Sequence, residues 1–440
     1  MSLPKEIDYV SSNTTTLPVN TSSKSNVIHP SNVSSLSTDT GGSVIFDVPS
    51  QDFLVPSSMY LRFKVKIVAD TGTTNTAKIY QRGIPAYSVW EKSIVSLNNS
   101  QIENLSNFGR TASTLINLKL NQAQKSGLAV AFGLTNELDA EDMTLAKNLH
   151  GRYTSVNNAD DTYDVAVPLL NCISLCQKLV PLGMMPAVRI ELEIANLNKF
   201  INNAVATASA SKVELTNMEL CYDSVNFGAD FDATMMSLAD ENGDILIKTQ
   251  CHSVSTQTAD AIAGLQTLSF PQRLSSVKSV ITWFEGKHAN SKNKEYDSVD
   301  ITKGAGSYQY QIGNKYYPDV ALDTARNRAG VFMELNNAVN GSSHDILGGS
   351  MSISPEEFSI QDDDATDENE YGMFMCGVNT ERMSGLNQSL LTGVSTALTP
   401  ISLNVRCDNA PTQSTTANLL TIYDGILQIN LPSRSASLKI

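Results

Sequence analysis

Apolar and polar residues alternate along several stretches of the chain, beginning near residue 44. In residues 60–68, YLRFKVKIV, every second side chain from Leu61 to Ile67 is apolar, and the residues between them are basic. The same alternation recurs in residues 188–194 and in residues 401–407. A period of two is typical of strands that bury one face. The pattern therefore predicts a mainly β protein.

Turn residues separate these runs, and a helical period is confined to two short places. Residues 324–339 place apolar side chains on one face and follow Asp323, a good helix cap. Residues 113–125 form the second candidate helix. Because strands do not alternate regularly with helices, an antiparallel arrangement is favoured over a doubly wound sheet. Stretches rich in Gly, Asn, Asp or Ser mark the turns, for example 69–75, 241–244 and 340–343.

Residues 1–42 differ in composition from the rest of the chain. They contain 10 Ser, 6 Thr and 4 Asn, and their apolar residues follow no period. Such a segment cannot bury enough apolar surface to offset the entropy lost on ordering. We expect a flexible N-terminal arm, either a tail in solvent or a segment that becomes ordered on neighbouring subunits.

The length of 440 residues suits two β domains of similar size. A turn-rich stretch with several Asp residues, 228–244, interrupts the strand pattern between them. We therefore expect an arm at 1–42, a first β barrel or sandwich at 43–227, a linker at 228–242 and a second at 243–440.

The charge balance excludes a general role in holding nucleic acid. The chain has 31 Lys and Arg against 45 Asp and Glu, a net charge of −14, whereas phosphate binding needs concentrated basic residues. The six cysteines are too few and too scattered for a disulfide scaffold, so we expect reduced, mostly buried thiols. The N-terminus shows no apolar core of a signal peptide, and no stretch has the length of a membrane span.

No motif for catalysis or cofactor binding is present, and we expect no catalytic, cofactor-binding or metal-binding residues. The zinc motif HExxH and the glycine-rich phosphate loops are absent, and GVSTA at 393–397 misses the second Gly of a nucleophile elbow. Cys172 and Cys176 lack a second ligand pair, which favours packed thiols on neighbouring strands over a metal site. The five histidines are dispersed, which favours surface or loop positions. The acidic run 362–370 lacks the Gly and Glu of a calcium loop, so a solvated loop is favoured over a cation site.

Eight segments of the chain form an ordered series, at 44–68, 83–105, 178–196, 213–225, 274–284, 307–339, 399–409 and 419–433. Taken in this order, they resemble the double jelly-roll major capsid proteins of tailless icosahedral viruses, the lineage of adenovirus, virophages and Polinton-like viruses. The segments of the first half look like the opening and closing strands of a first barrel. In the second half, 274–284 resembles a Ser-Val-Lys strand of the family, 307–339 resembles its aromatic strand, Tyr-Pro turn and inserted helix, and 399–409 with 419–433 look like its terminal strand pair.

The resemblance implies an all-β fold of two consecutive eight-stranded jelly rolls with a few inserted helices. It implies a major capsid protein that assembles into pseudo-hexagonal homotrimers and then into an icosahedral shell. Its partners would be itself, neighbouring capsomers, and penton and minor capsid proteins, with contact to an internal membrane left open. The protein would be made in the host cytoplasm or nucleus and reside in the virion, with no enzymatic activity and no cofactor.

Two other classes of function stay open at this point. A minor capsid, penton or spike protein would usually have one barrel and a fivefold arrangement. A carbohydrate-binding module or hydrolase on a jelly-roll scaffold would need carboxylates and exposed aromatic side chains in one groove. Trp90 and Trp283 lie in strand-like runs, where a core position is favoured over a sugar platform.

Overall fold

The first half of the chain forms two antiparallel sheets that pack face to face. The computed structural model describes residues 21–69, 78–79, 84–98, 100–135, 150–151, 162–202, 210–228, 243–285, 298–340, 351–353, 358, 372–381, 392–411 and 414–440. One sheet contains β1 (Ser22–Ile28), β2 (Ser35–Ser37), β4 (Phe53–Leu54), β5 (Tyr60–Ala69), β11 (Tyr163–Pro168), β12 (Val180–Pro181) and β15 (Ala210–Asn226). The other contains β3 (Ser43–Val48), β7 (Trp90–Leu97), β8 (Ser100–Ser106) and β13 (Val188–Ile194). The rings of Phe63 on β5 and Trp90 on β7 meet edge to face, 5.4 Å apart, between the sheets.

The second half repeats this arrangement. One sheet contains β16 (Asp244–Ala259), β18 (Val277–Phe284), β21 (Met375–Asn379), β23 (Thr415–Asn430) and β24 (Ser435–Lys439). The other contains β17 (Gly264–Phe270), β19 (Gly306–Ile312), β20 (Lys315–Asp323) and β22 (Ile401–Cys407). The hydroxyl of Tyr310 on β19 donates to Thr282 Oγ1 on β18 across 2.9 Å, which joins the two sheets.

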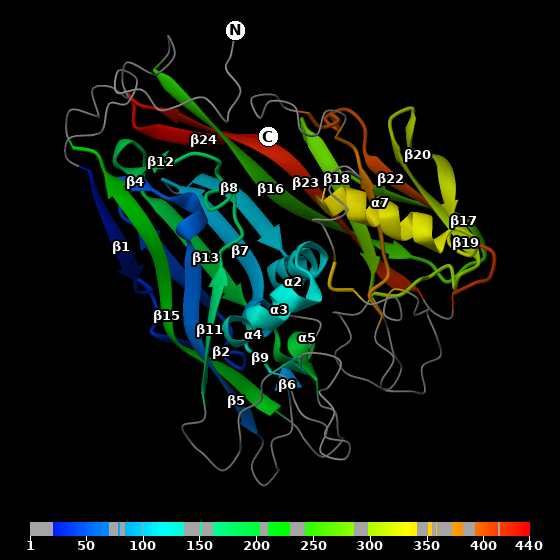
Figure 1. Cartoon of the computed structure of the whole chain (residues 1–440), viewed down its shortest axis with the longest axis horizontal. Helices are drawn as coiled ribbons and strands as arrows, with labels where there is room; N and C mark the ends of the chain where they lie inside the picture. Colours follow the sequence, from blue (N-terminus) through cyan, green and yellow to red (C-terminus); the bar gives the residue numbers. More distant parts are fainter. Residues whose placement is uncertain are drawn as a thin grey trace, which may run out of the picture.

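The strand orders of the two halves are the same. In the first half the orders are β11-β5-β15-β1 and β3-β13-β7-β8. In the second half they are β21-β18-β23-β16 and β17-β22-β19-β20. Two four-stranded sheets connected in this way form an eight-stranded jelly roll. The expected double jelly roll is confirmed, and the two barrels lie side by side along the long axis of the molecule (Figure 1).

The strands form where the sequence alternates, because each strand buries one face. On β5, Leu61, Phe63 and Val65 are buried, whereas Arg62 is exposed. β13 and β22 show the same alternation of buried and more exposed residues. The remaining two-stranded sheets pair β6 (Lys78–Ile79) with β14 (Ile201–Asn202) and β9 (Leu134–Thr135) with β10 (His150–Gly151).

The helices lie in the connections between strands. In the described part of the chain they include α1 (Pro85–Ser88), α2 (Phe108–Lys119), α3 (Gln122–Gly127), α4 (Ala129–Phe132), α5 (Leu197–Phe200) and α7 (Arg328–Asn340), with 3-10 turns at Pro56–Ser58 and Leu182–Met184. α2 follows β8 and α7 follows β20, so both barrels carry a helix at the same place in their connectivity.

Both expected helices exist, but their limits differ from the prediction. α7 begins at Arg328 because the side chain of Asn327 accepts a hydrogen bond from the Gly330 amide and so caps the helix. Asp323 instead accepts from the amides of Ala325 and Arg326 in a turn that precedes the helix. The expected helix 113–125 is two helices, because Asn121 caps α3 in a capping box.

The expected flexible arm is in part a structural strand. Residues 22–28 form β1, which pairs along its length with β15, and residues 35–37 form β2 on the same edge of β15. β1 occupies in the first barrel the position that β16 occupies in the second. The seven-residue ladder orders this polar segment, since its backbone groups pair although its side chains stay largely exposed. Residues 1–20 and 229–242 lie outside the described residues.

The ladder between β1 and β15 predicts how truncation affects the first barrel. Deleting residues 1–42 removes β1, β2 and the buried side chain of Leu36. We expect a lower melting temperature than for the full chain, measured by scanning calorimetry. Deleting residues 1–20 is the control, since it keeps both strands; equal melting temperatures for the two truncations would contradict this prediction.

Candidate functional site: the junction between the barrels

The two barrels meet along β8 of the first and β16 of the second, which lie beside each other. The segment after β11 crosses to β16, where the amide of Gln177 donates to the Lys248 carbonyl across 3.0 Å and the Thr249 hydroxyl donates to the Cys172 carbonyl. On the helical side, the amide of Ser352 donates to the Asn117 carbonyl of α2 across 3.0 Å. Backbone groups from both halves of the chain therefore fix the junction.

The first barrel covers the sheet of the second barrel with helix α2. The guanidinium of Arg110 on α2 lies over the ring of Trp283 on β18, 5.5 Å from its centre. α7 covers the neighbouring strand β21, where a side chain in place of Gly377 would come within 2.8 Å of Leu335. Trp90 and Trp283 are both fully buried, as the sequence predicts, and neither forms a sugar platform.

A carboxyl group is buried at the junction. Glu103 on β8 accepts a hydrogen bond from the Cys172 amide across 2.8 Å, and its Oε1 atom has no partner among the described residues. Burial raises the pKa of Glu103 to about 7, although the hydrogen bond from Cys172 acts to lower it. Burial, together with the nearby charge of Glu103, raises the pKa of the Cys251 thiol on β16. The sequence could not indicate this site, because its members come from both halves of the chain.

A second group of ionisable residues lies on β16, β18 and β23. Asp424 is buried, and its Oδ1 atom lies 3.4 Å from Lys248 Nζ and 3.9 Å from Lys278 Nζ. Its Oδ2 atom accepts from the Ser276 hydroxyl across 3.0 Å. Two cations and a hydroxyl thus compensate the buried carboxylate.

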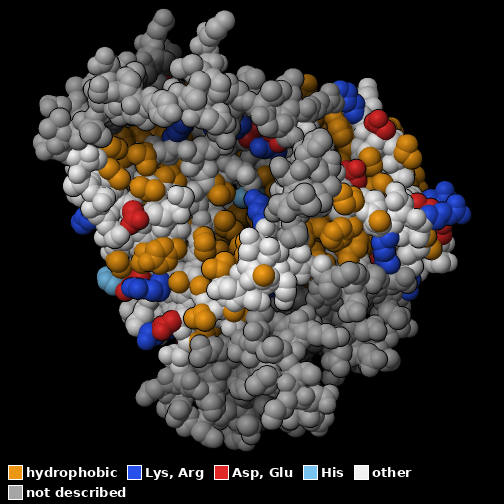
Figure 2. Space-filling model, in the orientation of Figure 1, with side chains coloured by type: hydrophobic (Ala, Val, Ile, Leu, Met, Phe, Trp, Pro, Cys, Tyr) orange, Lys and Arg blue, Asp and Glu red, His pale blue; other side chains and the backbone are white. Residues whose placement is uncertain are grey.

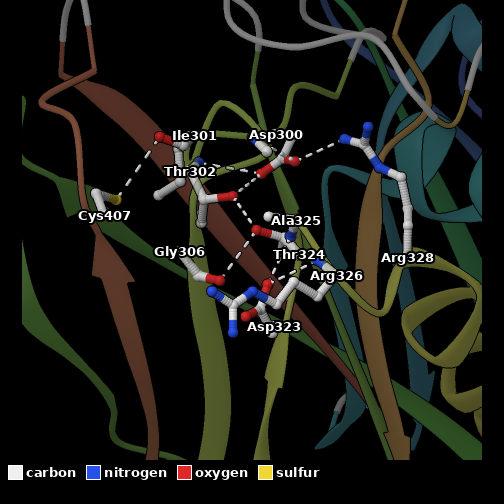
Figure 3. Close-up of polar contacts among 11 residues, drawn as sticks. Asp300, Ile301, Thr302, Gly306, Asp323, Thr324, Ala325, Arg326, Arg328 and Cys407 are labelled. Carbon is white, nitrogen blue, oxygen red and sulfur yellow. Dashed lines mark hydrogen bonds and ion pairs between the residues drawn. The ribbon is translucent and has the colours of Figure 1, made fainter.

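A third polar network holds the start of α7 against the second barrel (Figure 3). Asp300 is fully buried and accepts from the Thr302 amide across 3.0 Å and from Arg328 Nη2 across 2.7 Å. The Thr302 hydroxyl lies 2.6 Å from that of Thr324, which donates to the Gly306 carbonyl. Burial raises the pKa of Asp300, and the hydrogen bonds from Thr302 and the charge of Arg328 oppose this rise. The network fixes the loop that contains Asp300 and Thr302 to the start of α7.

The six cysteines are free and buried, as the sequence predicts. Cys172 and Cys176 lie in the segment after β11 rather than on neighbouring strands, which corrects that expectation. The chain turns there because the side chain of Asn171 accepts from the Ser174 amide across 2.8 Å. Burial raises the pKa of the Cys176 thiol to about 12 and that of Cys172 well above its usual range. Thiols of this kind stay protonated and are poor nucleophiles.

The expectation for the histidines is wrong for one of them. His252 lies on β16 and is buried at the junction, where burial and the positive charge of Lys119 lower its pKa to about 3. It is therefore neutral and packs as a polar core residue. His29 is exposed, whereas His288, His344 and the acidic run 362–370 lie outside the described residues.

No group of three His, Cys, Asp or Glu side chains in the described part of the chain could hold a metal ion. GVSTA lies in an irregular segment, where the Gly393 amide donates to the Ser276 hydroxyl and Thr396 is buried against Leu274. Within the described ranges, no helix has both the length and the apolar character to cross a bilayer. Figure 2 shows apolar side chains over both barrels and charged ones in small groups of both signs, without a broad basic patch on the described part of that face.

Comparisons with known proteins show which fold this is. No protein-family model and no curated protein sequence matches the chain. Among solved structures, the Faustovirus major capsid protein matches with a TM-score of 0.61 at 9% identity, over 96% of this chain and 93% of that one. The PBCV-1 virus capsid matches with 0.58 at 9% identity, over 96% and 97%. The mavirus major capsid protein matches with 0.52 at 11% identity, over 100% and 95%.

The chain has the fold of viral major capsid proteins. The match extends over both barrels and nearly the whole length of each chain. At such low identity the likeness is one of backbone path, so it assigns no role to any single side chain.

Glu103 predicts a pH dependence of stability. The rise of its pKa from 4.5 in the unfolded chain to about 7 in the folded chain corresponds to about 3 kcal/mol. Below pH 4.5, Glu103 does not change the free energy of unfolding. Between pH 4.5 and about 7, ionisation of Glu103 in the unfolded chain lowers the free energy of unfolding, and above about pH 7 the lowering stays constant. We expect Glu103→Gln to remove this fall and to be the more stable protein at pH 8, measured by urea denaturation at each pH. A variant that is less stable at pH 8 would contradict the assignment.

The ion pair of Asp300 and Arg328 predicts a second effect. Arg328→Met leaves a buried carboxylate without its cation, and we expect a loss of about 3 kcal/mol at pH 8. The loss should shrink as the pH falls, because burial raises the pKa of Asp300 and its protonation removes the buried charge. In the double variant Asp300→Asn, Arg328→Met, part of the stability should return, as a double-mutant cycle in urea would show. Strictly additive losses would mean that the two side chains do not interact.

Proposed function

We propose that the chain is a major capsid protein whose homotrimers form pseudo-hexagonal capsomers of an icosahedral virion. The observation that carries the proposal is the presence, in one chain, of two jelly rolls with the same strand order lying side by side. The shared fold with viral major capsid proteins over nearly the full length supports it.

The geometry suits a closed ring. Three copies, each with two similar barrels, place six barrels around one axis, and a head-to-tail contact closes when the rotation per copy is a third of a turn. The resulting prism has six similar sides and tiles a shell. In this proposal the chain has two domains, 43–227 and 243–440 as expected from the sequence, with β1 and β2 of the arm completing the first.

The proposed role is structural rather than enzymatic. The buried thiols have raised pKa values and are therefore poor nucleophiles. The hydrogen bonds and the ion pair of Asp300 stabilise the fold. The further partners in the proposal are neighbouring capsomers and penton and minor capsid proteins. We expect no direct binding of nucleic acid, because the net charge of −14 repels phosphate.

Native mass spectrometry of the purified protein tests the proposal. We expect a species of three times the 47.6 kDa of one chain. It should persist in a thiol reductant and in a metal chelator, because the cysteines are free and buried. Two results together would refute the proposal. One is a purified protein that stays monomeric at micromolar concentration or forms pentamers. The other is its absence from hexagonal capsomers in electron cryomicroscopy of virions.

A further inference from the structure

A cation at the end of helix α2 lies near the second barrel without a carboxylate partner. Lys119 is the last residue of α2 and belongs to the first half of the chain. Desolvation and the charge of Lys278 on β18 lower the pKa of Lys119, and Lys119 in turn lowers the pKa of His252 on β16. Among the described residues, Lys119 forms no hydrogen bond and no ion pair. A lysine of one barrel therefore lies near a lysine and a histidine of the other.

The carboxylates of this region are already engaged by other cations. Asp424 Oδ1 lies 3.4 Å from Lys248 Nζ and 3.9 Å from Lys278 Nζ. Glu381 Oε1 lies 3.3 Å from the same Lys278 Nζ. Neither carboxylate perturbs the pKa of Lys119, whose shift comes from desolvation and from Lys278 alone. In the described part of the chain, three lysines thus stand against two carboxylates, and the excess is one positive charge at Lys119.

A buried hydrogen-bond donor at the same place has no acceptor. His252 is 3% exposed, and its Nε2 atom lies 3.2 Å from the side-chain amide nitrogen of Gln250. An amide nitrogen only donates, so Nε2 of the neutral ring accepts and Nδ1 carries the proton. Nδ1 has no hydrogen-bond partner among the described residues. An unpaired buried donor is costly, and this one lies near a lysine that also has no partner.

We propose that Lys119, Lys278 and His252 bind a small inorganic oxyanion of the phosphate type between the two barrels. The side chain of Lys119 is exposed, so an ion from solvent can reach it. An ammonium group offers up to three donors and the imidazole ring offers one, a set that suits an anion with several acceptor oxygens. The bound anion neutralises the excess charge and joins α2 of the first barrel to β16 and β18 of the second. The site is independent of the proposed function.

Scanning calorimetry of the full chain at pH 7.5 tests the proposal, in sodium phosphate and in sodium chloride of equal ionic strength. We expect phosphate to raise the melting temperature by about 2 °C, because a ligand that binds only the folded chain stabilises it. Lys119→Met should abolish this rise, and Lys119→Arg should keep most of it, because the cation and its donors remain. The matched control is Lys24→Met, which removes one exposed lysine on β1 and should keep the full rise.

The same variants separate a binding site from a purely structural lysine. In chloride, Lys119→Met should melt at or above the temperature of the parent chain, because it removes the repulsion from Lys278. A lysine that serves only the negative end of the α2 dipole would instead give a less stable variant in both salts. That result would overturn the inference. A rise in phosphate of equal size in Lys119→Met and the parent would also overturn it, since phosphate then acts on the whole surface.

Isothermal titration with sodium phosphate supplies a direct measurement. We expect the parent chain to bind one phosphate per chain, and Lys119→Met to bind it roughly tenfold more weakly or not at all. His252→Leu removes the ring donor and should weaken binding as well, whereas Lys24→Met should bind as the parent does. A parent chain that binds no phosphate overturns the inference and leaves the proposed function intact, because native mass spectrometry measures the trimer separately.

Discussion

The burial of one sheet of the second barrel against the first barrel is the interaction on which the rest of the structure depends. β5 alternates between buried and more exposed residues, as a sheet facing water does. Its counterpart β18 is buried at nearly every residue, because Arg110 of α2 stacks on Trp283 and α7 packs alongside. The two barrels have one topology but are not interchangeable. Because of this asymmetry the two ends of the molecule differ. The contact between the barrels lies in the middle, and an edge strand, β1 or β20, lies toward each end.

The junction contains polar and ionisable groups where an apolar surface would also pack. Glu103 and His252 are both buried there, and both have perturbed pKa values. Buried charges contribute little net stability unless they are fully paired, but wrong arrangements that leave them unpaired are strongly disfavoured. We interpret these groups as fixing the register between the barrels. In the proposed ring of six barrels, small errors in that register would be multiplied.

The sequence predicts well those features that arise from local burial. The alternation from Leu61 to Ile67 identifies β5 because one side of that strand faces the core. β1 was missed because its residues, SSKSNVI, are largely exposed on both faces and show no alternation; its order comes from a ladder with residues 220–226. The start of α7 was misplaced because Asn327, rather than Asp323, caps it. Glu103 and His252 gave no signal, since both are buried where the two halves of the chain meet, with Cys251 near Glu103 and Lys119 near His252.

The pairing of β1 with β15 sets an order of events during synthesis. Ser22 is among the first described residues to leave the ribosome, yet its partner Asn226 belongs to the last strand of the same barrel. β1 therefore has no partner strand until half of the chain has been made. Contacts between such distant residues form slowly, and unpaired strand edges invite association with other chains. The nascent first barrel thus passes through a stage in which β1 has no partner strand and its unpaired backbone groups are open to a neighbouring polypeptide.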